Sequence, residues 1–416
     1  MKQKNITLIV AAAIAAMTAG TAAASGFQLL EQNASGLGNA YAGSAAVAED
    51  ASTIYFNPAG MTQLKQREFS LGGAAIKPSF KFTNNGSNVA PATNSGNGGD
   101  AGDWAVLPNA YLSWGVTKDI YLGLGLGAPF GLKTEYDDDW VGRYQATLFD
   151  IKTYNLNPSI AWRVNDKVSL GFGLNYQRME ATYERYAAVV NSATRSTKVS
   201  LDADGDAWGW NIGALFNVSP STKVGISYRS EIEHELEGDL TSNNQLVAPN
   251  AAASADVTLP QTFILSTTQK LNNQWEMMGD ISWTGWSSIQ KIDIKRTGTT
   301  VQSLDAEFRD TWRVALGANY QMNSSWKLRG GVAWDQSPVR GASTRLVSLP
   351  DNDRVWLSAG AQWKASEASR LDFGLSYLII GDTEIDNNQL AAGRGRVTGT
   401  YEGSVFIVGA QYSQAF

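Results

Sequence analysis

The sequence contains no cysteine and a single histidine in 416 residues, and only 17% of its residues are charged. The lack of cysteine excludes disulfide cross-links and thiolate metal sites. The histidine, His234, has acidic neighbours and no serine elbow near it, so we expect neither a Ser–His catalytic pair nor an enzyme. The net charge of −6 and the absence of a basic block argue against nucleic acid as a partner.

Cofactor and metal motifs are also missing. The stretch GLGNAYAG (36–43) lacks the spacing and the strand–turn–helix context of a dinucleotide loop. The stretch DADGDAW (202–208) has a misplaced glycine and no closing glutamate for a calcium loop. We therefore expect no cofactor and no metal.

Long hydrophobic runs are confined to the N terminus. Residues 1–24 combine a basic start, an apolar core at 8–17 and an Ala-Ala-Ala site at 22–24, which predicts a signal peptide cleaved before Ser25. No later run reaches the ~18 apolar residues of a transmembrane helix. The chain is expected to be exported, and its fold must be held by something other than disulfides.

What the sequence has in quantity is glycine and aromatic residues, with 41 Gly, 14 Trp, 15 Tyr and 14 Phe. In VSLGFGLNYQ (168–177), apolar side chains occupy every second position, and small or polar ones lie between them. The stretches 120–126, 210–218 and 371–379 show the same alternation. A period of two predicts β-strands.

A soluble β-sandwich would share this alternation, but three features favour a barrel in lipid. The segments often exceed ten residues, which suits the ~9–11 residues of a tilted transmembrane strand. Aromatic residues cluster near predicted strand ends, as in Trp283 and Trp286 or Tyr401 and Phe406, and the chain ends on Phe416. Only a closed barrel satisfies every backbone group in hydrocarbon. We therefore predict an all-β transmembrane protein with twelve to sixteen antiparallel strands.

Two kinds of connection separate the predicted strands. Short polar turns at 165–167 and 323–325 are typical of the periplasmic side. The stretches 83–103 and 242–257 are rich in Gly, Asn, Ala and Ser and are interpreted as extracellular loops. The strand pattern continues to the C terminus, so we expect one barrel domain over residues 67–416.

Residues 25–66 lack the alternation. Glycines interrupt them and Asn57-Pro58 stiffens their end, so they are expected to form short helices and turns rather than a first strand. A compact, weakly charged segment ahead of a barrel can fill its lumen and convert an open water channel into a gated path.

The stretches SGFQLLEQNASGLGNAYAG (25–43) and AEDASTIYFNPAGM (48–61) resemble the N-terminal hatch of the FadL family of outer-membrane long-chain fatty acid transporters. The Asn-Pro-Ala triplet is the signature of that family. The hatch-motif residues are Phe27, Asn57, Pro58 and Ala59. The likeness extends along the mature chain through the stretches 228–238, 333–339 and 349–360.

The resemblance implies a monomeric barrel of about fourteen strands in the outer membrane of a Gram-negative bacterium, with residues 25–66 as a hatch. It implies hatch-gated passive diffusion of long-chain fatty acids with lateral exit through a kinked strand. The expected partners are a fatty acid or another hydrophobic small molecule, outer-membrane lipid and lipopolysaccharide.

The stretch GLGLGAPFGLKTEY (123–136) is a strand pattern broken by a proline and a glycine. Proline cannot donate to a β-ladder and glycine marks bulges, so pairing should be lost there. The resemblance places the family's kinked third strand here. An ordinary strand end entering a loop is the alternative. The candidate kink residues are Ala128, Pro129, Phe130 and Gly131.

Arg185 matches the family position at which an arginine contacts the ligand carboxylate, and its fork can bind both carboxylate oxygens. A salt bridge to Glu184 or Glu180 is the alternative. The second basic contact of the family is missing, because Leu304 stands in its place and the basic pair at 295–296 lies upstream across a gap. Two alternatives therefore stay open: uptake of monoaromatic or alkane hydrocarbons, and a surface receptor or structural barrel without transport.

Overall fold

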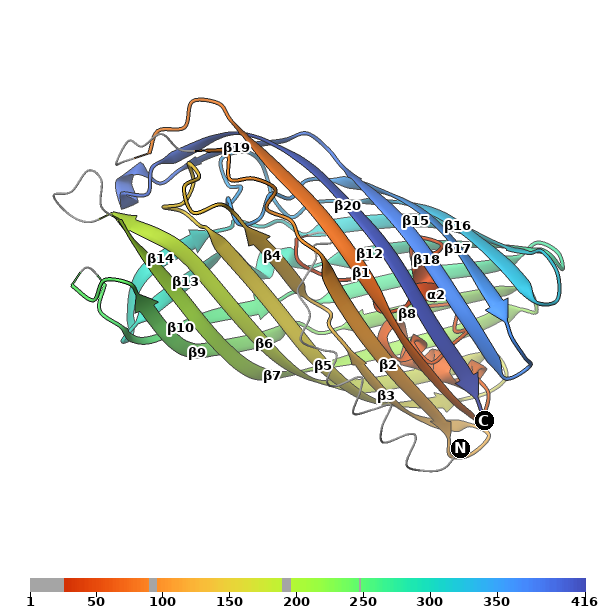
Figure 1. The fold of residues 1–416 in the computed structure, drawn as a ribbon. Coiled ribbons are helices and arrows are strands. Elements are labelled where there is room, and N and C mark those ends of the chain that lie inside the picture. Colours follow the sequence, from red (N-terminus) through yellow and green to blue (C-terminus); the bar gives the residue numbers. More distant parts are fainter. Residues whose placement is uncertain (1–25, 90–95, 189–195, 247) are drawn as a thin grey trace.

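The computed structural model describes residues 26–89, 96–188, 196–246 and 248–416, so the predicted signal peptide lies outside the described residues. A single antiparallel sheet forms the wall (Figure 1). Its segments are β1 (Arg67–Asn84), β2 (Ala105–Gly115), β3 (Ile120–Gly127), β4 (Gly131–Glu135), β5 (Leu148–Arg163), β6 (Val168–Ala188), β7 (Ser196–Ser219), β8 (Thr222–Arg229), β9 (Ile232–Ser242), β10 (Ala251–Leu259), β11 (Thr262–Lys270), β12 (Trp275–Thr284), β13 (Lys291–Arg296), β14 (Thr299–Asp305), β15 (Thr311–Gln321), β16 (Trp326–Asp335), β17 (Arg354–Lys364), β18 (Ser369–Ile380), β19 (Thr383–Asn388) and β20 (Arg396–Ala415).

The sheet closes on itself, because β1 pairs with β2 on one side and with β20 on the other, with Glu68 opposite Ala415. Within the described part of the chain, six strands are each interrupted into two segments, so the twenty segments make a barrel of fourteen strands. The divided strands are β3/β4, β8/β9, β10/β11, β12/β13, β14/β15 and β18/β19. Closure confirms the predicted barrel.

The two ends of the barrel differ. Tight turns, including those at 165–167 and 323–325, join strands at the end where β1 starts and β20 finishes; we call it the turn end. Long connections gather at the other, the loop end (Figure 1). The predicted loop 242–257 was too long, because β10 begins at Ala251 and pairs with β9. Its small residues alternate in burial as a strand's do.

In the membrane-spanning part, apolar side chains point outward and polar ones inward. Along β6, Leu170 is 43% exposed whereas Asn175 is fully buried. At the loop end the alternation is inverted: β9 buries Ile232 and Leu236 and exposes the acidic side chains between them. The lumen is therefore apolar at the loop end. No helix among the described residues is long and apolar enough to cross a membrane.

This inversion corrects part of the prediction that aromatic residues near strand ends lie at the membrane surface. Trp286 and Tyr401 do not belong to a ring at the membrane surface, because they are 0% and 2% exposed and face inward. Trp286 lies in the short helix η2 (Trp286–Ser288), which interrupts a wall strand and breaks the period-two count. Phe406 does face outward.

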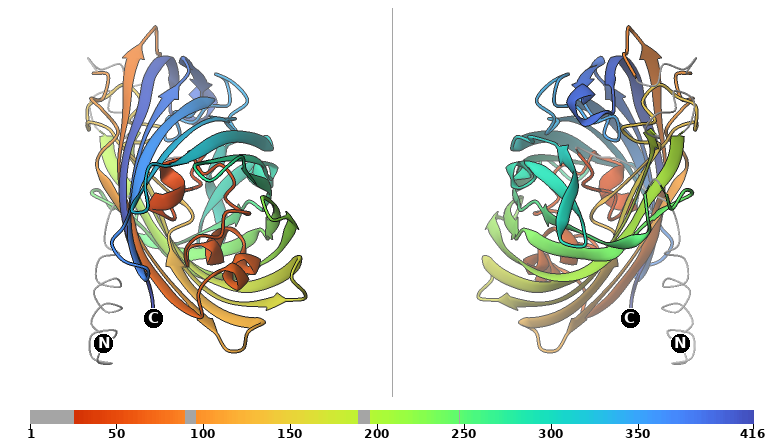
Figure 2. Two further views of the ribbon diagram at one scale, coloured as in Figure 1. Left: turned by 90° about the vertical axis from the view of Figure 1, so that its right-hand side faces the viewer. Right: turned by 90° about the vertical axis from the view of Figure 1, so that its left-hand side faces the viewer.

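Residues 26–66 fold inside the ring of strands, as the two end views show (Figure 2). They form short helices and turns. The helices are α2 (Ala34–Leu37), α3 (Thr53–Phe56) and η1 (Pro58–Gln63). A further short helix, η3 (Leu390–Ala392), belongs to the barrel connection between β19 and β20. Wall glycines permit the close approach: a Cβ at Gly213 would overlap the Asn57 side chain, and one at Gly331 would overlap the Asn39 backbone.

Candidate functional site

Arg185 lies in the loop-end half of the lumen, near the C-terminal end of β6. Its Nε donates to Gln302 Oε1 at 2.7 Å, and its Nη1 donates to the Tyr186 carbonyl at 3.2 Å. Gln302 Nε2 in turn donates to the Tyr183 hydroxyl at 2.7 Å. Aliphatic side chains form the rest of this headgroup pocket, namely Val199, Leu201, Leu240, Ile294 and Val301.

The alternative ion pairs of Arg185 do not form. Glu184 pairs with Lys198 at 2.7 Å, and Glu180 pairs with Arg178 at 3.6 Å. Among the described residues, no carboxylate lies within 4 Å of the Arg185 guanidinium. An arginine in an apolar pocket without a counter-ion favours the binding of an anion.

On β14, the position at which the resemblance would place a second cation holds Leu304, and this side chain is buried. Lys295 faces the other side of its strand and pairs with Asp256 at 2.6 Å. Arg394, in the connection between β19 and β20, is instead electrostatically coupled to Tyr183. Burial lowers the pKa of the Arg394 guanidinium, and Tyr183 and Asp305 partly offset that effect.

A hydrogen-bonded path joins the Arg394 loop to the headgroup pocket. The Tyr183 hydroxyl donates to the Gln145 carbonyl, and Gln145 Nε2 donates to the Gly395 carbonyl at 3.3 Å. Sequence reasoning missed Arg394, because more than two hundred positions separate it from Arg185 and no motif marks it.

The Asn-Pro-Ala triplet ties two hatch turns to the wall. Asn57 Oδ1 accepts from the Ala59 amide at 3.1 Å and caps η1, with Pro58 in its first turn. Asn57 Nδ2 donates to the Ala45 carbonyl at 2.7 Å and to the Ala214 carbonyl of β7 at 3.0 Å. The Asn57 side chain thus forms hydrogen bonds with the start of a helix, with a hatch turn and with the barrel wall.

The strand is interrupted between β3 and β4, at the residues where the kink was predicted. Gly127 pairs with Asn155 and Gly131 with Lys152, so the kinked strand has one residue more than β5 over this interval, which is a bulge. Pairing with β2 stops at Leu126, and β4 pairs only with β5 among the described strands. The wall therefore has an unpaired interval between β2 and β4.

Residues 27–30, which we call the strap, cover this interval from inside. The Leu29 amide donates to the Pro129 carbonyl at 2.8 Å, and the Gly131 amide donates to the Phe27 carbonyl at 2.8 Å. Gln32 Nε2 also donates to the Ala128 carbonyl at 2.8 Å. The hatch replaces the partners that the kink removes from the ladder.

Aromatic rings surround the strap at the kink. The Phe27 ring lies 4.9 Å from the ring of Trp286 and 6.1 Å from that of Phe130, both edge to face. The Phe308 ring also lies edge to face with Trp286, with the ring centroids 5.9 Å apart. This cluster is the apolar inner side of the unpaired interval.

A family model described as outer membrane protein transport protein (OMPP1/FadL/TodX) matches residues 15–416. The chain belongs to this family. The long-chain fatty acid transport protein of Escherichia coli O6:H1 is 30% identical over 453 residues, with 100% of both chains covered. The chain is an outer-membrane transport protein rather than an enzyme.

Solved structures show the same fold. A Pseudomonas aeruginosa FadL homologue superposes with a TM-score of 0.88 at 24% identity, covering 94% of this chain and 99% of that one. The Pseudomonas putida toluene transporter TodX gives a TM-score of 0.72 at 16% identity, covering 94% and 100%.

Ion pairs also hold the hatch to the barrel wall. Glu49 pairs with Lys327 at 2.8 Å and with Arg329 at 2.5 Å, and Arg329 also pairs with Asp372 at 2.8 Å. Burial alone would raise the pKa of Glu49, but the two cations outweigh it and hold that pKa far below its usual value. The strap has no such anchor among the described residues.

The single histidine and the acidic run at 137–139 make structural contacts. His234 hydrogen-bonds to Gln177 at 3.0 Å, facing the lumen. Asp138 pairs with Lys198 at 3.3 Å. Within the described ranges, no cluster of three or more His, Cys, Asp or Glu residues could hold a metal ion.

Proposed function

We propose that this family member carries long-chain fatty acids through the outer membrane by passive, hatch-gated diffusion. The observation that carries the proposal is the Arg185 guanidinium, which lies in an aliphatic pocket without a carboxylate partner among the described residues. A fatty acid supplies both missing parts, an anionic headgroup for the guanidinium and an alkyl chain for the walls. The name of the 30%-identical relative supports the same ligand class.

The proposed route runs from the headgroup pocket, past the strap, to the unpaired interval between β2 and β4. Residues 26–66 act as the hatch in this scheme, and the kink at 128–131 is the lateral exit. Lateral exit suits an alkyl chain, because each CH₂ is about 0.8 kcal/mol more stable in hydrocarbon than in water. A straight passage through a wet pore would forgo that stabilisation.

The test is equilibrium binding of a long-chain fatty acid and of toluene to the detergent-purified protein. The Arg185→Ala variant is compared with Arg178→Ala, whose arginine lies on the same strand and pairs outside the pocket with Asp204 at 2.8 Å. We expect fatty acid affinity to fall about tenfold or more in the first variant only. Equal affinities for wild type and Arg185→Ala would overturn the carboxylate site.

Uptake of uncharged hydrocarbons is the second candidate. Leu304 in place of a cation and the aromatic cluster around Trp286 favour it. Toluene binding that is unaffected by Arg185→Ala, without fatty acid binding, would move the assignment to this class. Binding of neither ligand would favour a surface receptor.

The surroundings of the barrel are also proposed from its surface. The outward apolar band would face lipid, and the loop end would lie among the lipopolysaccharide of the outer leaflet. A closed ring of strands exposes no sheet edge to a second copy, which supports a monomer. Native mass spectrometry in a mild detergent would report both lipid retention and the number of chains.

A further inference from the structure

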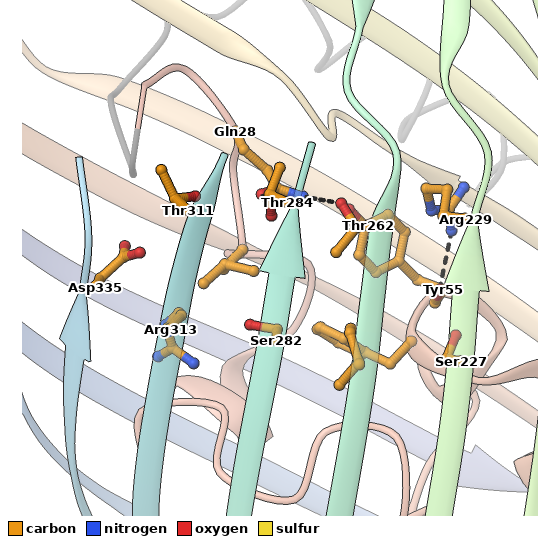
Figure 3. Close-up of a pocket in the computed structure, with 13 residues that line it drawn as sticks. Gln28, Tyr55, Ser227, Arg229, Thr262, Ser282, Thr284, Thr311, Arg313 and Asp335 are labelled. Carbon is orange, nitrogen blue, oxygen red and sulfur yellow. Dashed lines mark hydrogen bonds between the residues drawn. The ribbon is translucent and has the colours of Figure 1, made fainter. Parts of the chain in front are cut away.

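A second polar cavity lies deeper in the lumen, between the hatch and strands β8, β11, β12, β15 and β16 (Figure 3). Its volume is about 40 Å³, enough for about three water molecules or one carboxylate group. From the hatch, Gln28, Leu30, Tyr55 and Phe56 close it. The polar wall residues that line this inner cavity are Ser227, Arg229, Thr262, Ser282, Thr284, Thr311, Arg313 and Asp335.

Two of these side chains are buried arginines, with Arg229 9% and Arg313 7% exposed. Neither has a carboxylate within 4 Å in the part of the chain that the structure describes. Each has uncharged partners instead. Arg229 Nη2 donates to the Tyr55 carbonyl at 2.9 Å and Nη1 donates to Asn175 Oδ1, and its guanidinium lies 4.4 Å from the centre of the Tyr55 ring. Arg313 Nη2 donates to the Ala40 carbonyl at 2.6 Å, and its guanidinium lies 5.2 Å from the centre of the Trp356 ring. Neutral carbonyls do not cancel the charge of a buried cation.

Unsatisfied atoms mark the cavity as a site rather than a packing gap. Arg313 Nε is buried without a hydrogen-bond partner. Asp335 stands opposite Arg313 in the ladder, yet no ion pair joins them, and its Oδ2 has no partner. With two cations and one carboxylate, the lining lacks one negative charge.

Glu31 of the hatch interacts electrostatically with Arg313 but does not fill that role. It is absent from the lining, and its buried Oε2 has no hydrogen-bond partner. Burial raises the pKa of Glu31 to about 7, against the opposing effects of Arg354 and Arg313. At neutral pH this carboxyl therefore carries only part of a negative charge.

The inner cavity adjoins the exit. Gln28 Nε2 donates to Thr262 at 3.1 Å and Gln28 Oε1 accepts from Thr284 at 3.3 Å, while its backbone bridges Phe130 of the kink. Gln28 thus separates the arginines from the unpaired interval. Leu30 and Phe27 of the strap are apolar, so withdrawal of the strap would join a cationic end to an apolar opening.

We propose that the inner cavity is a second binding site for an anionic headgroup, in which Arg229 and Arg313 hold the ligand carboxylate while the alkyl tail leaves through the kink. The proposal rests on the proposed function and adds a second binding site to the transport route. A carboxylate that left Arg185 for the lateral exit would otherwise lose its counter-charge in a water-poor interior, which is strongly unfavourable. The inner site keeps the charge compensated until the tail has entered lipid.

The test compares transport of a long-chain fatty acid with that of the alcohol of equal chain length, in proteoliposomes. Arg313→Gln keeps a donor for the Ala40 carbonyl and removes the charge. Arg163→Gln is the matched control, because Arg163 also donates to a hatch carbonyl, that of Thr62, but lies outside the cavity. We expect Arg313→Gln to slow fatty acid transport about tenfold, with alcohol transport and fatty acid binding at Arg185 unchanged.

Asp335→Asn should have the opposite effect on ligand binding at the inner site. Removing the competing carboxylate should strengthen the inner site, so that a second equivalent of fatty acid binds in the titration. An equal slowing of acid and alcohol in Arg313→Gln, or no second equivalent in Asp335→Asn, would overturn the inner site alone. A wild-type protein that transports the alcohol and not the acid would overturn the proposed function, and the inner site with it.

Discussion

The backbone amide of Gly131 donates a hydrogen bond to the carbonyl of Phe27 at 2.8 Å. It joins the kinked strand of the wall to the strap of the hatch. Because β4 has no ladder partner in β2 among the described strands, the strap takes the place of a neighbouring strand. In the proposed mechanism, release of the strap would break the hydrogen bonds that cover the unpaired interval, so release and opening would occur together.

Straightening the kink should block exit without affecting binding. Replacing residues 128–131 by Val-Thr-Val-Thr restores a strand sequence that can pair with β2 and close the unpaired interval. We expect fatty acid uptake to be lost and equilibrium binding to stay within twofold of wild type. Uptake at the wild-type rate would show that the ligand leaves elsewhere.

Arg394 should contribute to affinity for a charged ligand. Its guanidinium adds positive potential near Tyr183 at intermediate dielectric, worth about 1 kcal/mol, so Arg394→Gln should weaken fatty acid binding about fivefold and leave toluene binding unchanged. Arg396→Gln is the control, because that arginine pairs with Asp386 on the outer surface at 2.5 Å. Equal losses in both variants would indicate a general disturbance of the loop.

The Glu49 cluster should hold the seated hatch. In Glu49→Gln, Lys327 loses its partner, while Arg329 keeps Asp372. We expect seating to weaken by about 1–3 kcal/mol, measured as more frequent leak events in planar bilayers. Glu367→Gln breaks an exposed pair with Lys364 and should change nothing. If neither variant shows more leak events than the wild type, the anchoring role is contradicted.

Hatch seating should depend on pH through Glu31, whose pKa burial raises to about 7. An unseated hatch exposes this carboxyl to water, where its pKa is about 4.3. Between those two values the seated state binds more protons, so seating weakens as pH rises from about 4.5 to 7 and is constant outside that window.

The corresponding measurement is leak conductance at pH 5 and pH 8. We expect more leak at pH 8, and Glu31→Gln should remove the difference. Asp335, Arg313 and Arg354 are the other charged groups that act on Glu31. A pH response that survives in Glu31→Gln would assign it to the carboxyl of Asp335, because the two arginines keep their charge between pH 5 and pH 8.

The local pattern of the sequence determined the barrel and its lipid-facing surface. Alternation along 168–177 predicts which side chains point outward, because a strand turns successive residues to opposite faces whatever surrounds it. The same reasoning separates residues 25–66 from the wall, and proline with glycine at 129 and 131 locates the kink through their own backbone restrictions.

The tertiary structure alone decided which residues meet in the lumen. Arg185, Gln302 and Tyr183 form one hydrogen-bonded group, and Gln145 links this group to the loop that carries Arg394, because closing the barrel brings distant strands to one cavity. It also inverted the faces at the loop end, where Tyr401 turns inward. At the loop end, water surrounds the barrel and the pocket inside it is apolar. The period of two therefore still holds, but the apolar face points into the lumen and the polar face points to water.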